Sequence, residues 1–385
     1  MNLDLLKVAM ALRGLKVLEF NGLLPVPFCG MVLAGSVTRI DKIGFDTTLD
    51  CLGNGKKSIS LDLKHPKGVD IVKCLSRKSD VLIEPFRRGV MERLGLGPDV
   101  LLKDNPELIY ARLTGYGHIG PYSRNAGHDI NYLALSGLLS TFGRYGENPN
   151  PPVNLLADIG GGGLTCTLGI LLALIERSKS GLGQIVDNTM VEGSAYLGSW
   201  LYRAKKHQLW GNERGRNTLD GGRHYYEVYK TKDGKFVTVG ALEPQFYKVL
   251  LKGLQLTEEE APQVSSSREY EKVKNIFKKK FLEKTRDEWS EIFGYTDACV
   301  APVLTIDEAP HFPHNAIRDS FVKTGDIVAP NPHPRLSNTP GVSKATEPLP
   351  ETGEHTKEIL VDLGFTSEEI HHLQRDRVIE CFQAS

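Results

Sequence analysis

Apolar runs of strand length alternate with stretches of helical periodicity over the first half of the chain. Between the runs, His65 to Lys78 places apolar side chains at helical spacing, and Leu94 to Leu102 predicts a further short helix. Such alternation is typical of a parallel sheet in an open α/β layer. The predicted strands are Leu15–Phe20, Val37–Asp41, Ser58–Asp62, Val81–Glu84 and Leu108–Leu113.

The same alternation continues to about residue 206. Helical periodicity covers Asp129 to Leu139 and Gly160 to Ser178. A further strand, Ile185 to Asp187, precedes a helix predicted from Met190 to Lys206. We therefore assign residues 1–205 to a large, Rossmann-like α/β domain with an open parallel sheet.

The composition changes after this region. Residues 206–223 are polar and rich in glycine, which is typical of a linker. Asp233-Gly234 then separates two strand-like runs and predicts a hairpin. Lysine- and glutamate-rich helices follow, notably 269–293, so we predict a small α+β domain over residues 224–325. A proline-rich return segment and two closing helices, residues 326–385, should pack on the large domain.

The charge balance and the cysteine pattern exclude several classes of protein. The chain has 47 Lys plus Arg against 47 Asp plus Glu, so no net charge draws it to nucleic acid or to an anionic membrane. Apolar runs such as 164–175 are shorter than a membrane span of about 20 residues. The six cysteines form no C-x-x-C pair. We therefore expect no nucleic-acid partner, no membrane partner and no metal site.

A dinucleotide is the first ligand to consider for such a sheet, and it requires a G-x-G-x-x-G turn after the first strand. Here the turn reads Asn21-Gly22-Leu23-Leu24-Pro25-Val26-Pro27. Its prolines leave too few backbone N–H donors to hold a pyrophosphate. The sequence therefore argues against dinucleotide binding.

Two ionisable residues, His128 and Asp158, lie where helices are expected to begin. A helix start offers free backbone N–H groups and the positive end of the helix dipole. The glycines 160–163 follow Asp158 closely and would let a ligand approach the backbone. Taken singly, each residue is explained more simply as a helix cap. Together with the glycine run, which capping does not require, they indicate acid–base chemistry.

Three further residues, Arg87, Arg88 and Glu243, also have a simple structural explanation. Arg87 and Arg88 follow a predicted strand, at the edge where open α/β sheets bind ligands. Solvated surface arginines would explain them equally well. Glu243 precedes Pro244 at a predicted helix start, where its simplest role is a cap.

Longer motifs unite these positions in one pattern. The chain resembles the class III CoA transferase family and, within it, the enzymes that racemise 2-methylacyl-CoA thioesters. The resemblance covers nearly the whole chain from Met10. The motifs that carry it are IEPFRRGVME (83–92), GHDINYLALSG (127–137), NLLAD (154–158), MVEG (190–193), LDGG (219–222), EPQFY (243–247), TDAC (296–299) and GEHT (353–356).

This resemblance implies an interlocked homodimer whose active site lies between the large domain of one subunit and the small domain of the other. It also implies an isomerase that inverts the centre beside a thioester carbonyl through an enolate. His128 would remove the proton from one face and protonated Asp158 would deliver one to the other, while Glu243 would hydrogen-bond the histidine. No cofactor is implied, because CoA is part of the acyl-CoA substrate.

The acid role requires Asp158 to be protonated, although an ordinary aspartate has a pKa near 3.9. Burial raises that pKa and a helix dipole lowers it, so the sequence leaves the net shift open. The resemblance further implies a peroxisomal or mitochondrial enzyme of branched-chain fatty acid and bile acid metabolism, although an S-K-L ending is not seen. The implied CoA contacts are Lys42, Leu61, Asp62, Leu63, Lys64, Arg87, Gly127, Asp129, Ile130, Asn131 and Tyr132.

The chain departs from the family pattern at several positions, which we place mainly near the CoA-binding edge. Around residues 34–39 it is about three residues shorter, so the first helix or the second strand should be trimmed. Arg223-His224 replaces the family's Ala-Pro. Two other functions stay open. One is a CoA transferase in which Asp158 attacks the thioester as a nucleophile, and the other is a decayed paralogue that only binds acyl-CoA.

Overall fold

The computed structural model describes residues 11–33, 35–48, 50–205, 210–264 and 266–382. The chain divides into two compact units. The small unit takes in 137–152, which the sequence analysis assigned to the large domain, and it resumes at Gly198, before the predicted linker. The large unit comprises Met1–Ser136, Val153–Leu197 and Ala316–Ser385, and the small unit comprises Gly137–Pro152 and Gly198–Asn315.

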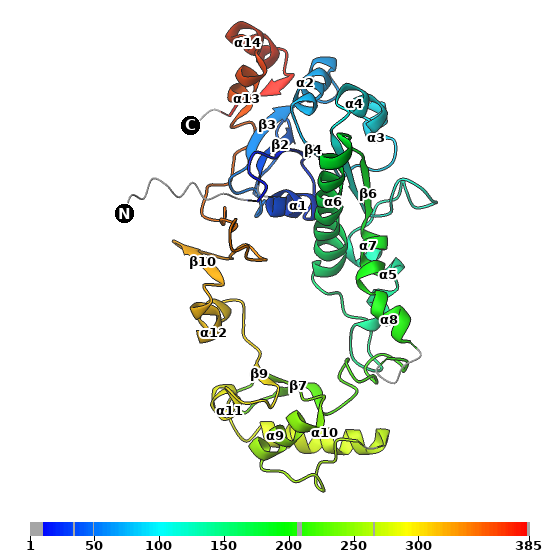
Figure 1. Cartoon of the computed structure of the whole chain (residues 1–385), viewed down its shortest axis with the longest axis vertical. Helices are drawn as coiled ribbons and strands as arrows, with labels where there is room; N and C mark the ends of the chain where they lie inside the picture. Colours follow the sequence, from blue (N-terminus) through cyan, green and yellow to red (C-terminus); the bar gives the residue numbers. More distant parts are fainter. Residues whose placement is uncertain (1–10, 34, 49, 206–209, 265, 383–385) are drawn as a thin grey trace. The chain divides into compact units, whose positions relative to one another are not determined.

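A seven-stranded sheet forms the centre of the large unit (Figure 1). Its order is β12-β3-β2-β1-β4-β5-β6, in which β1 to β6 are parallel and the edge strand β12 is antiparallel. The order 3-2-1-4-5-6 is that of a Rossmann sheet, so the predicted fold class is confirmed. The strands are β1 (Lys16–Phe20), β2 (Ser36–Lys42), β3 (Lys57–Leu61), β4 (Val81–Glu84), β5 (Ile109–Thr114), β6 (Ile185–Thr189) and β12 (Ile379–Glu380).

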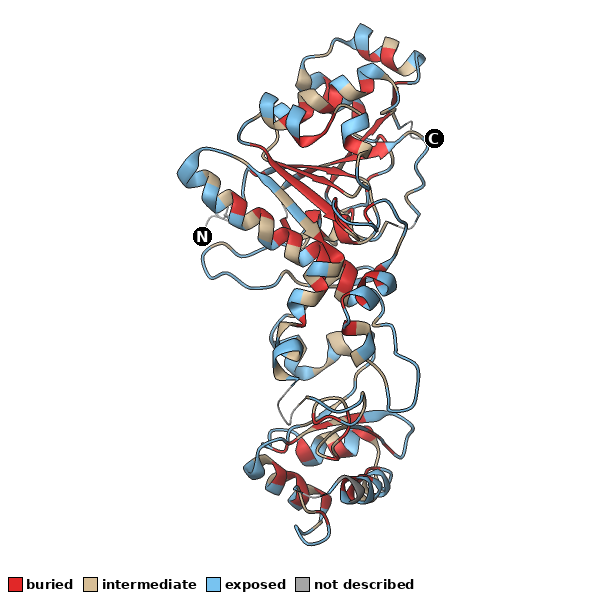
Figure 2. Ribbon diagram, turned by 90° about the vertical axis from the view of Figure 1, so that its right-hand side faces the viewer, coloured by how far each residue is buried: buried red, intermediate tan, exposed pale blue. Residues whose placement is uncertain are grey.

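Helices cover both faces of this sheet, and most of its strands are buried (Figure 2). On one face, sheet residues such as Leu18 and Phe20 share a core with α2, α3, α4, α13 and α14. Burying one such side chain contributes roughly 1.5–3 kcal/mol. The opposite face is covered by α1 and α6. The bounds are α1 (Pro25–Leu33), α2 (Pro66–Arg77), α3 (Val90–Arg93), α4 (Pro98–Asp104), α6 (Thr165–Ser180), α13 (Thr356–Leu363) and α14 (Ser367–Arg375).

The small unit has its own core around a three-stranded antiparallel sheet. His224 is fully buried in this core, with its Nε2 2.9 Å from the Tyr247 hydroxyl, and burial lowers its pKa to about 3. This departure from the family pattern therefore belongs to the packing of the small unit and not to the edge of the large sheet. The elements are β7 (Tyr226–Lys230), β8 (Phe236–Gly240), β9 (Val300–Pro302), α9 (Pro244–Leu254), α10 (Ser267–Phe281) and α11 (Arg286–Phe293).

Several predicted boundaries differ from the structure. The helix predicted over 190–206 is two helices, α7 (Met190–Leu197) and α8 (Ser199–Ala204), and its last residue lies outside the described part. The pattern over 269–293 also divides, because the Thr285 hydroxyl accepts the Glu288 N–H and starts α11. The linker, as far as it is described, is a folded loop, in which buried Asn217 accepts the N–H groups of Gly211 and Asn212.

The shortened stretch leaves the second strand whole. β2 has seven residues, and five of them pair with β1, from Lys16 opposite Ser36 to Phe20 opposite Ile40. α1 ends at Leu33, so only two residues connect the helix to the strand. The absence of a β-carbon at Gly35 makes this close turn possible, because such a carbon would lie 2.4 Å from the Leu15 carbonyl oxygen.

Residues 155–180 form one continuous helical run of π-helical η3 (Leu155–Leu164) and α6. By length and composition alone this run could cross a membrane, which the sequence analysis did not expect. In the structure, 44% of its most apolar window is buried. The remaining elements are α5 (Asp129–Leu135), η2 (Leu138–Thr141), η4 (Ala309–His311), α12 (Pro313–Ile317) and the hairpin β10 (Phe321–Thr324) and β11 (Ile327–Pro330).

Candidate active site

The position of Asp158 before the glycines suggested a helix cap, but in the structure Asp158 does not cap a helix. The helix starts earlier, at Leu155, and Asn154 precedes it in a left-handed backbone conformation with φ +61°. Asp158 therefore lies inside the first turn of η3, where it is buried. π-Helical turns are rare and occur frequently at functional sites.

The glycine run after Asp158 has a packing function, which corrects our interpretation that it serves ligand access. A β-carbon on Gly161 would lie 2.5 Å from the Ser194 nitrogen in α7, and one on Gly163 would lie 2.9 Å from the Pro25 carbonyl oxygen in α1. Gly193 of α7 comes equally close, since its β-carbon would lie 2.0 Å from the Gly161 carbonyl oxygen. The glycines thus let η3 approach two neighbouring helices at backbone distance.

Asp129 holds the turn that contains Asp158. Its Oδ2 accepts the backbone N–H of Ala157 at 2.9 Å and that of Asp158 at 2.8 Å. These N–H groups lie at the start of η3, where no earlier turn can supply acceptors. Asp129 is also the first residue of α5, directly after His128. One buried carboxylate therefore fixes the backbone of Asp158 and links it to the helix that begins directly after His128.

The surroundings of Asp158 favour its protonated form. Burial raises the pKa of its carboxyl group, and the charge of Asp129 adds to the rise. Two groups oppose this shift of the pKa: Asn154, whose Nδ2 donates to Asp158 Oδ2 at 2.9 Å, and the neighbouring His128. The net pKa is raised, which answers the question that the sequence left open.

His128 is exposed and caps α5, as the simpler interpretation of the sequence proposed. Its backbone N–H donates to Asn131 Oδ1 at 3.1 Å. On the other side of this turn the Tyr132 hydroxyl donates to the Gly127 carbonyl oxygen, and the Tyr132 ring meets Tyr116 edge to face at 4.9 Å. The backbone around His128 is thus held on both sides, while its imidazole stays accessible.

The predicted CoA contacts lie at the carboxyl edge of the parallel sheet. Lys42 ends β2 opposite Leu61, which ends β3, and Arg87 follows β4. Lys42 and Lys64 are exposed and Asp62 and Leu63 are half-buried, but the Leu61 side chain belongs to the core and could offer only backbone atoms. The contacts predicted after β5 belong to the His128 turn, where Asp129 and Tyr132 are buried, Gly127 is half-buried, and Ile130 and Asn131 are exposed.

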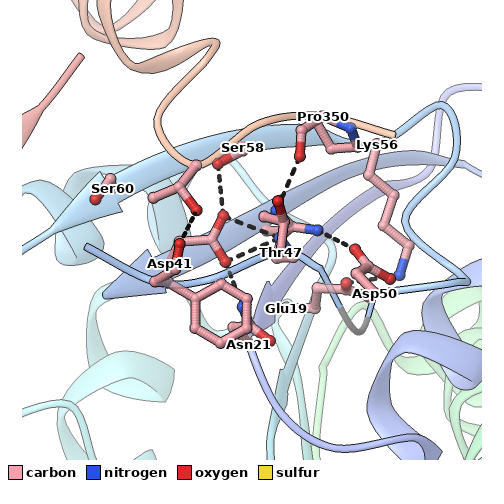
Figure 3. Close-up of polar contacts among 12 residues, drawn as sticks. Glu19, Asn21, Asp41, Thr47, Asp50, Lys56, Ser58, Ser60 and Pro350 are labelled. Atoms are coloured by element: carbon pink, nitrogen blue, oxygen red, sulfur yellow. Dashed lines mark hydrogen bonds and ion pairs between the residues drawn. The ribbon is translucent and has the colours of Figure 1, made fainter. Parts of the chain in front are cut away.

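A buried polar network fixes the end of β2 from which Lys42 extends (Figure 3). Arg39 Nε lies 2.9 Å from both carboxylate oxygens of Asp41, and Ser58 Oγ donates to Asp41 Oδ2 at 2.6 Å. Arg39 Nη2 also reaches the Pro350 carbonyl oxygen of the return segment at 3.3 Å. Charged residues in the run Val37–Asp41 were the sequence signal for this network, which our reasoning missed.

Glu243 belongs to the small unit, where it is exposed and occupies the N-cap position of α9 without a capping hydrogen bond from its side chain. The large unit contains His128 and Asp158, so the structure brings together these two predicted catalytic residues and leaves the third in the other unit. Among the described residues no group of three His, Cys, Asp or Glu side chains could hold a metal ion.

Comparison with known proteins places the chain in a family. A family model described as CoA-transferase family III matches residues 12–356. The chain is 54% identical to alpha-methylacyl-CoA racemase of Mus musculus and 52% identical to that of Homo sapiens, in each case over 96% of this chain and 98% of the relative. Its fold is similar to that of a CAIB/BAIF family protein from Brucella suis, with a TM-score of 0.79 and 22% identity over 92% of this chain and 100% of that one. The chain therefore belongs to CoA-transferase family III.

Proposed function

We propose that this protein racemises 2-methylacyl-CoA thioesters, the activity named for its mouse and human relatives. The observation that carries the proposal is the pairing of accessible His128 with buried Asp158, whose pKa is raised by burial. A two-face proton transfer requires a base on one side of the α-carbon and a protonated acid on the other, and the raised pKa favours the protonated form of Asp158. We propose no cofactor besides the CoA of the substrate.

In the proposed reaction, the neutral imidazole of His128 takes the α-proton and the electron pair of the C–H bond moves into the thioester as an enolate. Asp158 then gives its proton to the opposite face of the same carbon, and the carbonyl re-forms. In the reverse direction Asp158 is the base and His128 is the acid. Glu243 would support the imidazolium, and Lys42 and Arg87 would meet the anionic groups of CoA.

A CoA transferase is the second candidate, because the family name itself describes that activity. Its nucleophile would be an ionised Asp158, attacking the thioester carbonyl. The raised pKa of Asp158 and the adjacent His128 favour proton transfer over nucleophilic attack. A decayed paralogue is the third, and the complete pairing of β2 gives it no support in the stretch where the chain is short.

Deuterium incorporation tests the proposed function directly. One epimer of a 2-methylacyl-CoA in deuterated water should yield both epimers, each with deuterium at the α-carbon. In single-turnover measurements, His128→Ala should slow exchange from one epimer more than from the other, and Asp158→Ala should do the converse. Absence of exchange in the unmodified protein would rule out the racemase, and an Asp158–CoA thioester trapped with an acid acceptor would establish the transferase.

We also propose that a second copy of the chain covers the exposed face of α6 and supplies Glu243. The apolar residues Leu168, Leu172 and Ile175 recur on one side of this helix, in line with Leu164 at the end of η3, and each of the four is at least half exposed. Sedimentation velocity should find a dimer, which Leu168→Glu with Leu172→Glu should dissociate. Glu368→Lys, a charge change on exposed α14, is the control. A monomeric parent protein would refute the dimer.

The compartment follows from kinship alone. We propose a peroxisomal or mitochondrial location, with a role in branched-chain fatty acid and bile acid breakdown or synthesis. Fractionation of cells with an antibody to the native protein would test this, and a purely cytosolic signal would contradict it.

A further inference from the structure

A second cluster of buried ionisable side chains lies beside the candidate site, at the carboxyl ends of β4 and β5. Glu84 ends β4 and is fully buried, and Arg112 lies opposite it on β5. His118 comes from the loop after β5 and is 9% exposed. Burying charged groups of this kind destabilises the fold unless they are paired, so we consider how these three side chains interact.

The three side chains converge on one another. Arg112 Nη1 lies 3.1 Å from His118 Nδ1, and because an arginine can only donate, the histidine carries its proton on Nε2. That Nε2 is 3.8 Å from Glu84 Oε1, and Arg112 Nε is 3.6 Å from the same oxygen. These three atoms are the buried polar atoms of the cluster that lack hydrogen-bond partners. They are two donors facing one acceptor, at distances longer than the roughly 2.9 Å of a typical N–H···O hydrogen bond.

The cluster stands at the base of two loops that the proposed reaction needs. Glu84 Oε2 accepts the Phe86 N–H at 2.7 Å, and so fixes the start of the loop that presents Arg87. His118 lies in the loop that ends at His128. Farther out, the same two loops meet again, where Arg87 Nη1 reaches the Arg124 carbonyl oxygen at 3.4 Å.

We propose that His118 is a positioning residue, which with Glu84 and Arg112 ties the Arg87 loop to the loop that carries His128. The inference rests on the proposed racemase function. A CoA group held by Arg87 and a proton held by His128 must keep a fixed geometry, and displacements near 1 Å can cost on the order of 100-fold in rate. The cluster is buried, so it would maintain that geometry through the two loops and not by contact with the substrate.

The test separates hydrogen bonding at His118 from bulk packing. His118→Ala should lower kcat for deuterium exchange by about 10-fold or more while changing KM by less than about 3-fold. His118→Gln should restore kcat to within about 3-fold, because its amide offers an acceptor to Arg112 and a donor to Glu84. His372→Ala is the matched control, since His372 Nδ1 also lies within 2.8 Å of an arginine, Arg375, but on exposed α14.

A milder variant covers the case in which His118→Ala fails to fold. Glu92 Oε1 accepts a hydrogen bond from Arg112 Nη2, and its side chain is 43% exposed, so Glu92→Ala loosens the same guanidinium without opening a cavity. It should lower kcat in the same way but by less. Two outcomes would overturn the proposal. One is normal kcat in Glu92→Ala together with a folded, fully active His118→Ala. The other is an equal loss of kcat in His118→Ala and His118→Gln. If the unmodified protein exchanges no deuterium, the proposed function has failed first.

A non-folding His118→Ala combined with normal kcat in Glu92→Ala would also overturn it. In each of these cases the unmodified protein still exchanges deuterium, so failure of the positioning role is distinguishable from failure of the racemase assignment.

Discussion

The carboxylate of Asp129 accepts the backbone N–H of Asp158 over 2.8 Å, and so joins the helix that His128 caps to the π-helical turn that carries the aspartate. The same oxygen accepts the Ala157 N–H. Asp129 therefore aligns Asp158 through its backbone, while its negative charge favours the protonated Asp158 side chain.

Removal of this carboxylate should cost both stability and activity. Asp129→Ala leaves two buried N–H groups without an acceptor and lets the Asp158 turn move. Each unsatisfied N–H group should lower the free energy of unfolding by roughly 1–3 kcal/mol. We expect a lower free energy of unfolding in urea and a loss of deuterium exchange. Asp99→Ala, an exposed acidic residue in the first turn of α4, should cost only about 0.3–1 kcal/mol. Equal effects of the two substitutions would contradict the proposed role of Asp129.

Loss of the Asn154 amide should move the pH dependence of the reaction upward. The hydrogen bond from Asn154 lowers the pKa of Asp158, so Asn154→Gly should raise that pKa further. Glycine suits the positive φ of this position, which avoids backbone strain. Exchange that uses Asp158 as the acid should persist to higher pH, and exchange that uses it as the base should begin at higher pH. Profiles of kcat/KM that match those of the parent and of exposed Asn150→Gly would refute this.

The buried carboxyl of Glu84 should make the protein less stable as pH rises. Burial raises its pKa from 4.5 to about 8, although Arg112 and the Phe86 N–H lower it, and Glu92 and Asp187 raise it. Between these two values the folded chain holds a proton that the unfolded chain has lost, so stability falls with pH and levels off above about 8. His118, 3.8 Å away, and Tyr110 are further ionisable neighbours of this carboxyl.

Glu84→Gln mimics the protonated acid, so its stability relative to the parent should grow from pH 5 to pH 8 in denaturant titrations. Glu369→Gln serves as the control. The pKa of Glu369 is lowered by its capping hydrogen bonds, so this carboxyl is ionised in both states over that range and the difference should be flat. A flat difference for Glu84→Gln as well would show that the carboxyl is not held protonated.

The close helix contacts of η3 predict that alanine at Gly161 destabilises the protein more than alanine at the neighbouring Gly160. Gly161→Ala places a β-carbon 2.5 Å from a backbone nitrogen, so α7 must move and unfolding free energy should fall by about 1–3 kcal/mol. Gly160→Ala places it 2.8 Å from the end of the Leu197 side chain, which can rotate away. The first variant should melt at a lower temperature than the second, and identical melting temperatures would argue against the packing role.

The sequence by itself determined the large sheet and its six parallel strands, because the period of apolar residues follows directly from burial of strands and helix faces. The two-residue antiparallel edge strand β12 was not predicted. It also marked His128 and Asp158 as the pair to examine. It failed at Asp158's own helix, where the glycine run was taken as ligand space although Gly161 and Gly163 serve backbone contacts with α7 and α1. Only packing between segments distant in the sequence could distinguish these uses.

The tertiary structure decided what depends on neighbours from elsewhere in the chain. The pKa of the Asp158 carboxyl depends on burial and Asp129, which raise it, and on Asn154, which lowers it. The local sequence does not show which of these effects is larger. The Glu84–Arg112–His118 cluster arises because β4 and β5 pair in one register and a loop returns over them. Local periodicity fixes which elements form, whereas solvent exclusion and charge proximity in three dimensions decide what their side chains can do.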